Sequence, residues 1–374
     1  MKLALTTLCE RTDRKTGLTT FFSELVRHSL GQDKELEWIV FADPSAKLDL
    51  PNDRVRVVRW FSGRRLALRL AADHLLVGPA AKLLGASALL TVGFVPLVKP
   101  LPTVMHMIVL THLRQRNGAR SRYRHWMMAR GLRKAELIIA NSGWTRSQIA
   151  AFDPSCESRL TFTYEAPQHQ LFHPGSEAGE LERLRTEFGL GPGFLLWASN
   201  FYPYKQAELL LRAYARLDSD LRARVPLVMV GASWDGGLET AMAETNALGI
   251  TKDVRFLGWV EDAWLPGLFR HAAAFCLASR EETFGRCVVE AMACGTVCIL
   301  NDIPVLREVT DGNALFVDFR DTEATAKALR VALLDPASRH RLIAGGRARA
   351  EQFSFAGLAA KRIAAIHSML NGEI

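Results

Sequence analysis

Short apolar runs alternate with amphipathic stretches along the chain. Runs with the length and the bulky apolar residues of buried strands occur in the first half at 3–8, 36–42, 55–60, 103–109, 137–141 and 160–164. Between the first two runs, the segment Leu18–Leu30 carries apolar residues at helical spacing, among them Phe21, Phe22 and Leu25. Strands that alternate with helices in this way predict an α/β fold with parallel sheets.

A second α/β set follows a stretch that has no periodicity. This stretch, Glu165–Gly179, contains Pro167 and Pro174 and predicts a linker. Further strands are predicted at 194–199, 227–231, 254–257, 274–279, 297–300 and 315–318. We therefore expect two doubly wound domains, residues 1–170 and 171–352, that face a cleft in which ligands bind where strands end. Residues 353–374 contain an amphipathic helix that is expected to dock back on the first domain.

The composition narrows the class of protein. The chain has 374 residues, 49% of them hydrophobic and 23% charged, which excludes disordered, collagen-like and fibrous proteins. Six cysteines without a CxxC pair predict a reducing setting. The uncharged run between Lys82 and Lys99 is shorter than the ~20 residues of a membrane-spanning helix. We expect a soluble, cytoplasmic protein, with peripheral binding to the inner face of the membrane as an open alternative.

The net charge of +8 is unevenly distributed. No Asp or Glu occurs between His74 and Ala135, and basic residues gather in the second half of that window: Arg114, Arg116, Arg120, Arg122, Arg124, Arg130, Arg133 and Lys134. We interpret Arg120, Arg122, Arg124 and Trp126 as a surface for an anionic membrane or an anionic acceptor. A solvated helix face is the alternative. Nucleic acid is not expected as a partner, because no recognisable binding module accompanies the charge.

The stretch Phe275–Asn301 holds the most informative chemistry. A buried strand is followed by a polar loop, and a helix is predicted from about Arg286 to Cys294. Free backbone N–H groups of Thr283–Arg286 would lie at the helix N-terminus, where a phosphate or sugar hydroxyls are favoured. Glu282 precedes the helix and Glu290 lies about one turn inside it. Both carboxylates can therefore point into one cleft and accept hydrogen bonds from vicinal hydroxyls.

This stretch resembles the signature of a known family. Glu282 and Glu290 are separated by seven residues, with Phe284-Gly285 between them and the sequence Ala-Met-Ala-Cys-Gly after Glu290. The pattern resembles that of the retaining GT-B glycosyltransferases of family 4, also called glycosyl transferases group 1. Weaker matches extend over most of the chain, at Gly17, His106, Lys205, Val230-Gly231, Leu257-Gly258, Glu261-Asp262, Leu306–Val309 and the helix after Phe353. The resemblance implies two Rossmann-like domains.

The resemblance also implies roles for single residues. Glu290 would bind the ribose hydroxyls of a nucleotide-sugar donor, and Glu282 would lie close to the donor sugar and its scissile bond. The residues expected to take part in catalysis are His106, Glu282 and Lys205. The residues expected to bind the donor are Gly17, Asn200, Lys205, Thr283, Phe284, Gly285, Arg286 and Glu290.

Lys205 follows a predicted strand and precedes a helix. A cation at this place can neutralise the charge that develops on a leaving diphosphate. Two neighbourhoods depart from the family pattern. Asn200 stands where the family usually has an arginine, so Arg280 or Arg286 is a candidate for the missing cation. His106 ends an apolar strand and would hydrogen-bond the donor sugar or the acceptor, but Met107 follows it where the family often has Asp.

The expected reaction transfers a sugar from a nucleotide diphosphate to a hydroxyl, with retention of the anomeric configuration. The resemblance implies chemistry without a metal or another cofactor. The acidic pair Asp218 and Asp220 ends an amphipathic helix and is not expected to bind a metal. The acceptor would be a saccharide or a lipid-linked glycan of the cell-envelope polysaccharide or lipopolysaccharide type. A nucleotide-sugar epimerase on the same architecture, and a non-catalytic basic membrane-binding protein, are the alternatives.

Overall fold

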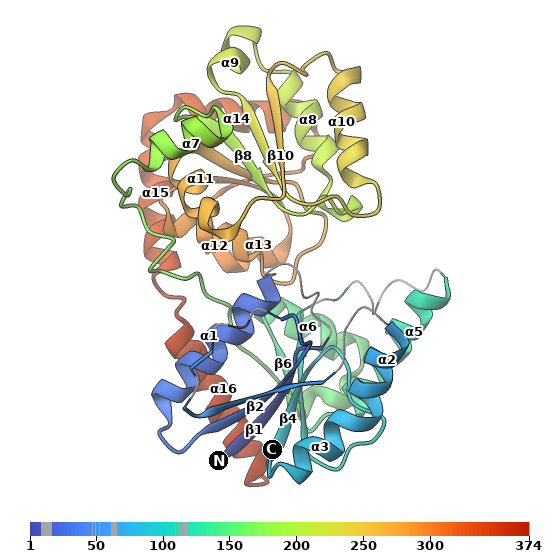
Figure 1. Cartoon of the computed structure of the whole chain (residues 1–374). Helices are drawn as coiled ribbons and strands as arrows, with labels where there is room; N and C mark the ends of the chain where they lie inside the picture. Colours follow the sequence, from blue (N-terminus) through green and yellow to red (C-terminus); the bar gives the residue numbers. More distant parts are fainter. Residues whose placement is uncertain are drawn as a thin grey trace. The chain divides into compact units, whose positions relative to one another are not determined.

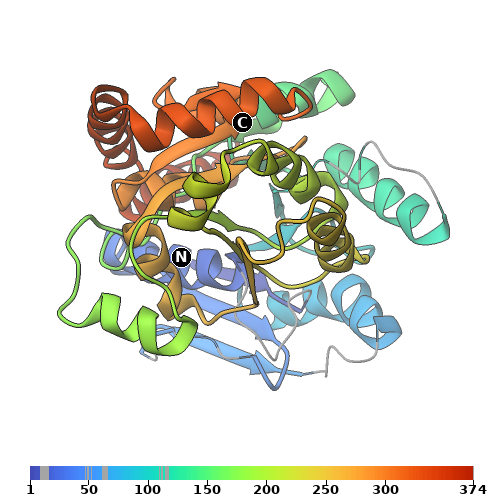
Figure 2. The same cartoon turned by 90° about the horizontal axis from the view of Figure 1, so that it is seen from above.

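The computed structural model describes residues 1–8, 17–46, 48, 50–51, 53–60, 66–108, 110, 113 and 118–373 (Figure 1). The chain divides into two compact units. The first unit contains Met1–Glu165 together with Ser354–Ile374, and the second contains Ala166–Phe353. Each unit is a parallel sheet with helices on both faces (Figure 1, Figure 2). This is the α/β architecture that the alternation of strands and helices predicted.

The first unit has a seven-stranded sheet in the order β3-β2-β1-β4-β5-β6-β7. Its strands are β1 (Lys2–Thr6), β2 (Glu37–Ala42), β3 (Val55–Arg59), β4 (Ala88–Val92), β5 (Thr103–Met107), β6 (Leu137–Ala140) and β7 (Leu160–Phe162). Its helices include α1 (Gly17–Gln32), α2 (Leu66–Ala71), the π-helix η1 (Ala72–Leu76), α3 (Val77–Leu83), α5 (Ala119–Lys134), α6 (Gly143–Phe152), the 3₁₀ helix η2 (Pro154–Arg159) and α16 (Phe355–Leu370). The interior strands read as continuous apolar runs because helices cover both of their faces.

The sequence predicted every strand of this sheet except β4. Ala88–Val92 lies inside the long stretch between Lys82 and Lys99, where no charged residue marks the ends of a strand. The residues that follow Gly17 do form the expected helix, and Gly17 is its first residue.

The last helix of the chain belongs to the first unit. Ser354 begins it, since the Oγ atom of Ser354 accepts a hydrogen bond from the backbone N–H of Gly357 (3.1 Å). α16 packs against α1 (Figure 1). The ring of Phe355 stacks on His28 with centroids 5.9 Å apart. Arg362 is among the residues that this helix buries.

The second unit has a six-stranded sheet in the order β10-β9-β8-β11-β12-β13. Its strands are β8 (Phe194–Ala198), β9 (Leu227–Val230), β10 (Val254–Gly258), β11 (Ala272–Leu277), β12 (Val297–Asn301) and β13 (Leu315–Val317). Its helices are α7 (Glu180–Phe188), η3 (Pro203–Lys205), α8 (Ala207–Ala215), α9 (Ser219–Arg224), α10 (Gly237–Ala247), η4 (Asp262–Trp264), α11 (Leu265–His271), α12 (Arg286–Ala293), α13 (Pro304–Thr310), α14 (Thr322–Leu334) and α15 (Pro336–Ala350). The central strands β8 and β11 lie side by side, so the loops that follow them are neighbours.

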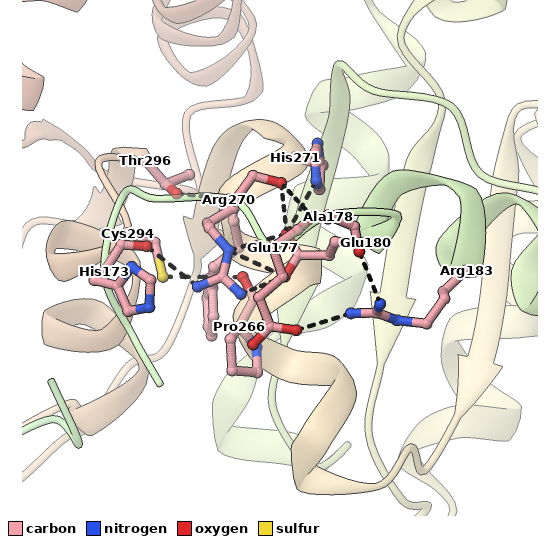
Figure 3. A network of polar contacts seen from close by, with 12 residues as sticks. His173, Glu177, Ala178, Glu180, Arg183, Pro266, Arg270, His271, Cys294 and Thr296 are labelled. Atoms are coloured by element: carbon pink, nitrogen blue, oxygen red, sulfur yellow. Dashed lines mark hydrogen bonds and ion pairs between the residues drawn. The ribbon is translucent and has the colours of Figure 1, made fainter. Parts of the chain in front are cut away.

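A buried polar network holds the segment before α7 against the rest of the second unit (Figure 3). The carboxylate of Glu180 pairs with the guanidinium of Arg270, and its Oε1 atom lies 3.0 Å from Nε2 of His271. Arg270 also donates to the carbonyl oxygens of Leu171 (2.8 Å) and His173 (3.2 Å). The predicted linker therefore has an ordered second half that is part of the second unit.

Candidate active site

The loop between β11 and α12 is held in one conformation. Gly285 precedes α12 with φ of 87°, and a Cβ atom at this position would lie 2.9 Å from Cδ2 of Leu306. The positive φ therefore favours glycine, and a larger residue would also require the Leu306 side chain to move. The buried ring of Phe284 packs edge-to-face on Phe353, with centroids 5.7 Å apart. These contacts fix the loop in front of the N-terminus of α12, which is where the sequence predicted backbone groups for a phosphate or a sugar.

A second loop, after β8, is tied to the first. The backbone N–H of Arg280 donates to the carbonyl oxygen of Tyr204 (2.9 Å). This contact brings Lys205 to the β11–α12 loop, where its Nζ atom lies 2.6 Å from Oε1 of Glu282. Both side chains are 11% exposed. The structure therefore unites two of the predicted catalytic residues in a nearly buried ion pair.

The electrostatics of this pair favour a charged lysine. Burial opposes the charge of Lys205, but the Glu282 carboxylate outweighs burial and raises the pKa of the Lys205 amine above its ordinary value. Burial raises the pKa of the neighbouring Cys287 thiol to about 12. Cys287 is therefore a protonated thiol at neutral pH and is not suited to act as a nucleophile.

Glu290 lies one turn into α12 and is 7% exposed. Its Oε1 atom lies 3.0 Å from Nε of Arg286, the residue four positions earlier on the same helix. Arg286 is thus paired with Glu290, the residue predicted to bind the ribose. The Glu290 carboxylate therefore partly neutralises the Arg286 cation, which the sequence offered as a partner for the diphosphate. A nearly buried carboxylate at the start of a helix is well placed to accept hydrogen bonds from vicinal hydroxyls.

Asn200 has a structural contact that the sequence did not predict. Its Oδ1 atom accepts a hydrogen bond from the backbone N–H of Ala232 (3.1 Å), which ties the loop after β8 to the loop after β9. Three aromatic rings, those of Tyr202, Tyr204 and Trp234, lie in the same two loops. Tyr202 stacks on Trp234 (5.2 Å between centroids) and on Tyr204 (5.4 Å), and Nζ of Lys205 lies 5.3 Å from the Tyr204 centroid. These rings went unnoticed in the sequence, although Tyr202 and Tyr204 flank the proline of η3.

The second unit thus gathers, at the carboxyl ends of β8 and β11, groups whose chemistry suits an anion and a polyol. The set consists of the Lys205 cation, two carboxylates and the N-terminus of α12. Across the described part of the chain, no three His, Cys, Asp or Glu side chains are grouped to hold a metal ion.

In the first unit, His106 lies on β5 and is 1% exposed. The rings of Phe21 and Phe22 pack edge-on against it, with centroids 6.3 and 6.1 Å away. The Nδ1 atom of His106 lies 2.7 Å from Nη1 of Arg362, which the sequence did not single out. Burial, reinforced by the Arg362 charge, lowers the pKa of His106 well below its ordinary value, so its imidazole is neutral at pH 7.

The basic segment forms α5, but its cations do not share one environment. Arg122 is exposed, and Trp126 is 50% exposed. Arg130 donates to the carbonyl oxygens of Val95 and Pro96, and Arg133 pairs with Asp153. The expectation of a single free basic face is therefore wrong for these two arginines, because each is used to hold α5 in place. Arg114, Arg116 and the side chain of Arg120 lie outside the described residues.

Exposed apolar residues lie beside α5. Leu75 and Leu76 of η1 and the pair Leu97 and Val98 are all exposed. The backbone N–H of Val98 donates to the carbonyl oxygen of His74 in η1, and Nε2 of the His74 ring lies 3.0 Å from the hydroxyl of Tyr123 on α5. None of the helices in the described ranges combines the length and the apolar character that crossing a bilayer requires.

Comparison with known proteins gives these residues a context. The family model described as "Glycosyl transferases group 1" matches residues 180–349, which include Lys205, Glu282 and Glu290. The O-antigen chain mannosyltransferase B of Escherichia coli is 30% identical over 239 residues, which are 63% of this chain and 61% of that protein. The chain spans less than two thirds of the length of the first curated relatives it matches.

Solved structures share the fold over nearly the whole chain. WaaG, a glycosyltransferase involved in lipopolysaccharide biosynthesis, has a TM-score of 0.77 at 17% identity, with 99% of this chain and 100% of that chain covered. Anabaena HepE in complex with UDP-glucose has a TM-score of 0.77 at 18% identity, with 98% and 100% covered. The fold is therefore that of the GT-B glycosyltransferases, and residues 180–349 of the chain resemble the family of glycosyl transferases group 1.

Proposed function

We propose that this chain is a retaining glycosyltransferase that moves a sugar from a nucleoside-diphosphate donor to a hydroxyl of a saccharide or a lipid-linked glycan. The observation that carries the proposal is the Lys205–Glu282 pair at 2.6 Å, in front of the N-terminus of the helix that holds Glu290. A cation for the diphosphate, a carboxylate for the sugar and a carboxylate for the ribose are the groups that such a donor requires.

Each group has a separate task in this reaction. Lys205 and the backbone N–H groups at the start of α12 stabilise the negative charge of the leaving diphosphate. Glu290 accepts hydrogen bonds from the ribose hydroxyls, and Glu282 holds the donor sugar. When the donor binds, the diphosphate takes the place of Glu282 as the partner of Lys205. Glu282 is then released to accept hydrogen bonds from the sugar. His106 donates a hydrogen bond to the sugar or the acceptor.

The bond changes need no protein nucleophile. The bond between the anomeric carbon and the diphosphate oxygen breaks, and the acceptor oxygen forms its bond to the same carbon on the same face. The acceptor proton passes to the departing diphosphate oxygen, and the nucleoside diphosphate leaves. The protonated state of Cys287 agrees with this scheme, because this thiol, which interacts electrostatically with Lys205 and Glu282, offers no thiolate for a covalent intermediate.

The acceptor is proposed to be presented at a membrane. The exposed Arg122 and Trp126 of α5 and the exposed leucines of η1 combine positive charge with apolar side chains. Such a combination suits the interface of an anionic membrane. A cytoplasmic enzyme held peripherally on the inner leaflet would meet a lipid-linked saccharide there. The names of the mannosyltransferase and WaaG, which refer to O-antigen and lipopolysaccharide, support a cell-envelope glycan as the product.

The first experiment is a thermal-shift screen against UDP, GDP, ADP and their common sugar conjugates without added metal. One nucleotide that raises the melting temperature identifies the donor class, and the UDP-glucose complex of HepE makes UDP the first candidate. The screen is followed by NMR of the product formed with that donor and a saccharide acceptor. If the new glycosidic bond has the same anomeric configuration as the bond to the diphosphate in the donor, the result supports retention. Conversion of the donor sugar without an acceptor would show an epimerase, and no binding of any nucleotide would overturn the proposal.

A further inference from the structure

Arg362 connects the last helix of the chain to two strand ends in the first unit. His106 near the end of β5, and Thr163 directly after β7, lie on either side of β6. Arg362 reaches both residues from α16. Its Nη1 atom lies 2.7 Å from Nδ1 of His106, and its Nε donates to Oγ1 of Thr163 (2.6 Å). Its guanidinium carbon lies 4.6 Å from the ring centroid of Phe21.

The burial of this arginine has a cost that packing alone does not explain. Arg362 is 1% exposed, and burial lowers its pKa to about 9. Within the described part of the chain, Arg362 has no carboxylate within salt-bridge distance, although the charge of Glu165 opposes the effect of burial. A buried cation without a close counter-ion is unfavourable. The presence of such a cation therefore points to a task, and its hydrogen bonds indicate what that task is.

The bond to His106 fixes the position of the histidine proton. A guanidinium has N–H donors and no acceptor, so Nδ1 of His106 must be the acceptor. A neutral imidazole that accepts at Nδ1 carries its proton on Nε2. The Nε2 atom is buried and finds no partner among the residues that the structure describes. A buried N–H donor without a partner is a site at which a ligand oxygen can bind.

We propose that Arg362 is a positioning residue that holds His106 as a neutral hydrogen-bond donor, with the Nε2–H group directed to an oxygen of the donor sugar or the acceptor. This inference rests on the proposed function and deepens it, because it makes His106 a donor and removes it as a general base at Nε2. It also assigns the C-terminal helix to the function of the first unit, although that helix is far from His106 in the sequence.

The tautomer can be measured without any substrate. Protein labelled with ¹⁵N-histidine is studied by two-bond ¹H–¹⁵N correlation at pH 7, and the His106 signal is identified by its loss in His106→Asn. We expect the pure Nε2–H form in the wild type. In Arg362→Met, the signal should shift towards a mixture of tautomers. An unchanged His106 signal in folded Arg362→Met would overturn the inference.

Kinetics then test whether the link matters for transfer. With the nucleotide sugar from the binding screen, Arg362→Met should lower kcat by about tenfold to hundredfold, with a smaller effect on KM. The reason is that the hydrogen bond from Arg362 orients the His106 ring, whose Nε2–H group contacts the substrate. In a His106→Ala background, the same change should have no further effect on kcat. An equal loss in that background would show that Arg362 acts through stability alone. Lys361→Met, an exposed neighbour on α16, is the matched control.

Two milder variants keep the test valid if Arg362→Met does not fold. Arg362→Lys retains a donor and a charge, and it should keep the Nε2–H tautomer and lose less activity than Arg362→Met. Thr163→Val removes the second anchor of the guanidinium and should lower kcat by a few-fold. A wild-type protein that transfers no sugar would refute the proposed function, while the tautomer measurement would still decide whether Arg362 controls His106.

Discussion

Nζ of Lys205 and Oε1 of Glu282 are 2.6 Å apart, although 77 positions separate the two residues in the sequence. They come from the loops that follow β8 and β11, which are adjacent strands of one sheet. Each residue is the expected ligand of a different part of the donor. In the structure they pair with each other, so the proposed function requires donor binding to exchange one ionic contact for another. The pair favours the charged state of the Lys205 amine, whose pKa the Glu282 carboxylate raises.

The ion pair makes a first prediction about stability. Lys205→Met and Glu282→Gln should each lower the free energy of unfolding by roughly 2–3 kcal/mol, because each leaves a nearly buried partner unsatisfied. The double variant should lose less than the sum of the two, and urea denaturation measures all three. Additive losses would contradict a direct interaction in solution. Lys205→Met should also abolish the thermal shift caused by the nucleotide, whereas Lys252→Met, at an exposed position, should retain it.

The pH dependence of the pair has a defined sign. The pKa of Lys205 is raised in the folded state, so its contribution to stability is complete below the ordinary lysine pKa of about 10.4. This contribution is lost as the pH rises through the folded pKa. The difference in stability between the wild type and Lys205→Met should therefore be constant from neutral pH to about pH 9 and should shrink above about pH 10.

The sequence predicted the layers of the fold, and it pointed to the stretch that holds three of the candidate site residues, for a physical reason. Parallel strands buried on both faces read as apolar runs, and Glu282, Gly285 and Glu290 lie in one continuous stretch. Arg362 could not be found in this way, because an arginine in an amphipathic helix normally lies on the solvated face. Its partners at His106 and Thr163 are brought near it by tertiary structure alone.

Glu290 provides a prediction that separates ribose binding from general damage. Glu290→Gln should weaken binding of the nucleoside diphosphate by about tenfold to hundredfold, since a hydrogen bond to a charged acceptor contributes about 1.5–3 kcal/mol. The loss should largely disappear with the 2′,3′-dideoxy analogue, which has no hydroxyls for Glu290. Isothermal titration calorimetry measures the affinities of the wild type and of Glu290→Gln for each of the two ligands. An equal loss for both ligands would assign the effect of Glu290→Gln to its contact with Arg286 rather than to the ribose.

The network around Glu180 should stabilise the second unit without affecting catalysis directly. Burial alone would raise the pKa of Glu180, but the hydrogen bonds and charges of Arg270 and His271 outweigh burial and lower it. Glu180→Gln should therefore destabilise the protein by about 2–4 kcal/mol at pH 7, because Arg270 remains buried without its partner.

This loss should depend on pH in the opposite direction from that at Lys205. A carboxyl group with a lowered folded pKa contributes fully above its ordinary pKa of about 4.3, and its contribution is lost as the pH falls through the folded value. Chemical denaturation of the wild type and Glu180→Gln at pH 7 and near pH 3 should show the two curves converging in acid. Glu182→Gln, on the exposed side of α7, is the control. A difference that persists in acid would attribute the effect to packing.

The surface of α5 gives the prediction that bears on the acceptor. The triple variant Arg120→Ser, Arg122→Ser and Arg124→Ser should bind vesicles of phosphatidylglycerol and phosphatidylcholine about tenfold or more weakly at low salt, because each cation near an anionic surface contributes about 1 kcal/mol. Vesicle sedimentation measures the binding. The matched control removes three exposed cations from the second unit, Lys327, Arg341 and Arg347.

The two contributions to membrane binding can be separated by salt. The charge of α5 should matter less as the ionic strength rises, whereas the contribution of Trp126 and the neighbouring Leu75 should persist. Trp126→Ser should therefore weaken binding at both low and high salt, while the arginine variant should approach the wild type at high salt. Equal vesicle binding by the wild type, the arginine variant and the control would show that α5 is an ordinary solvated helix. A soluble saccharide would then be the acceptor to test first.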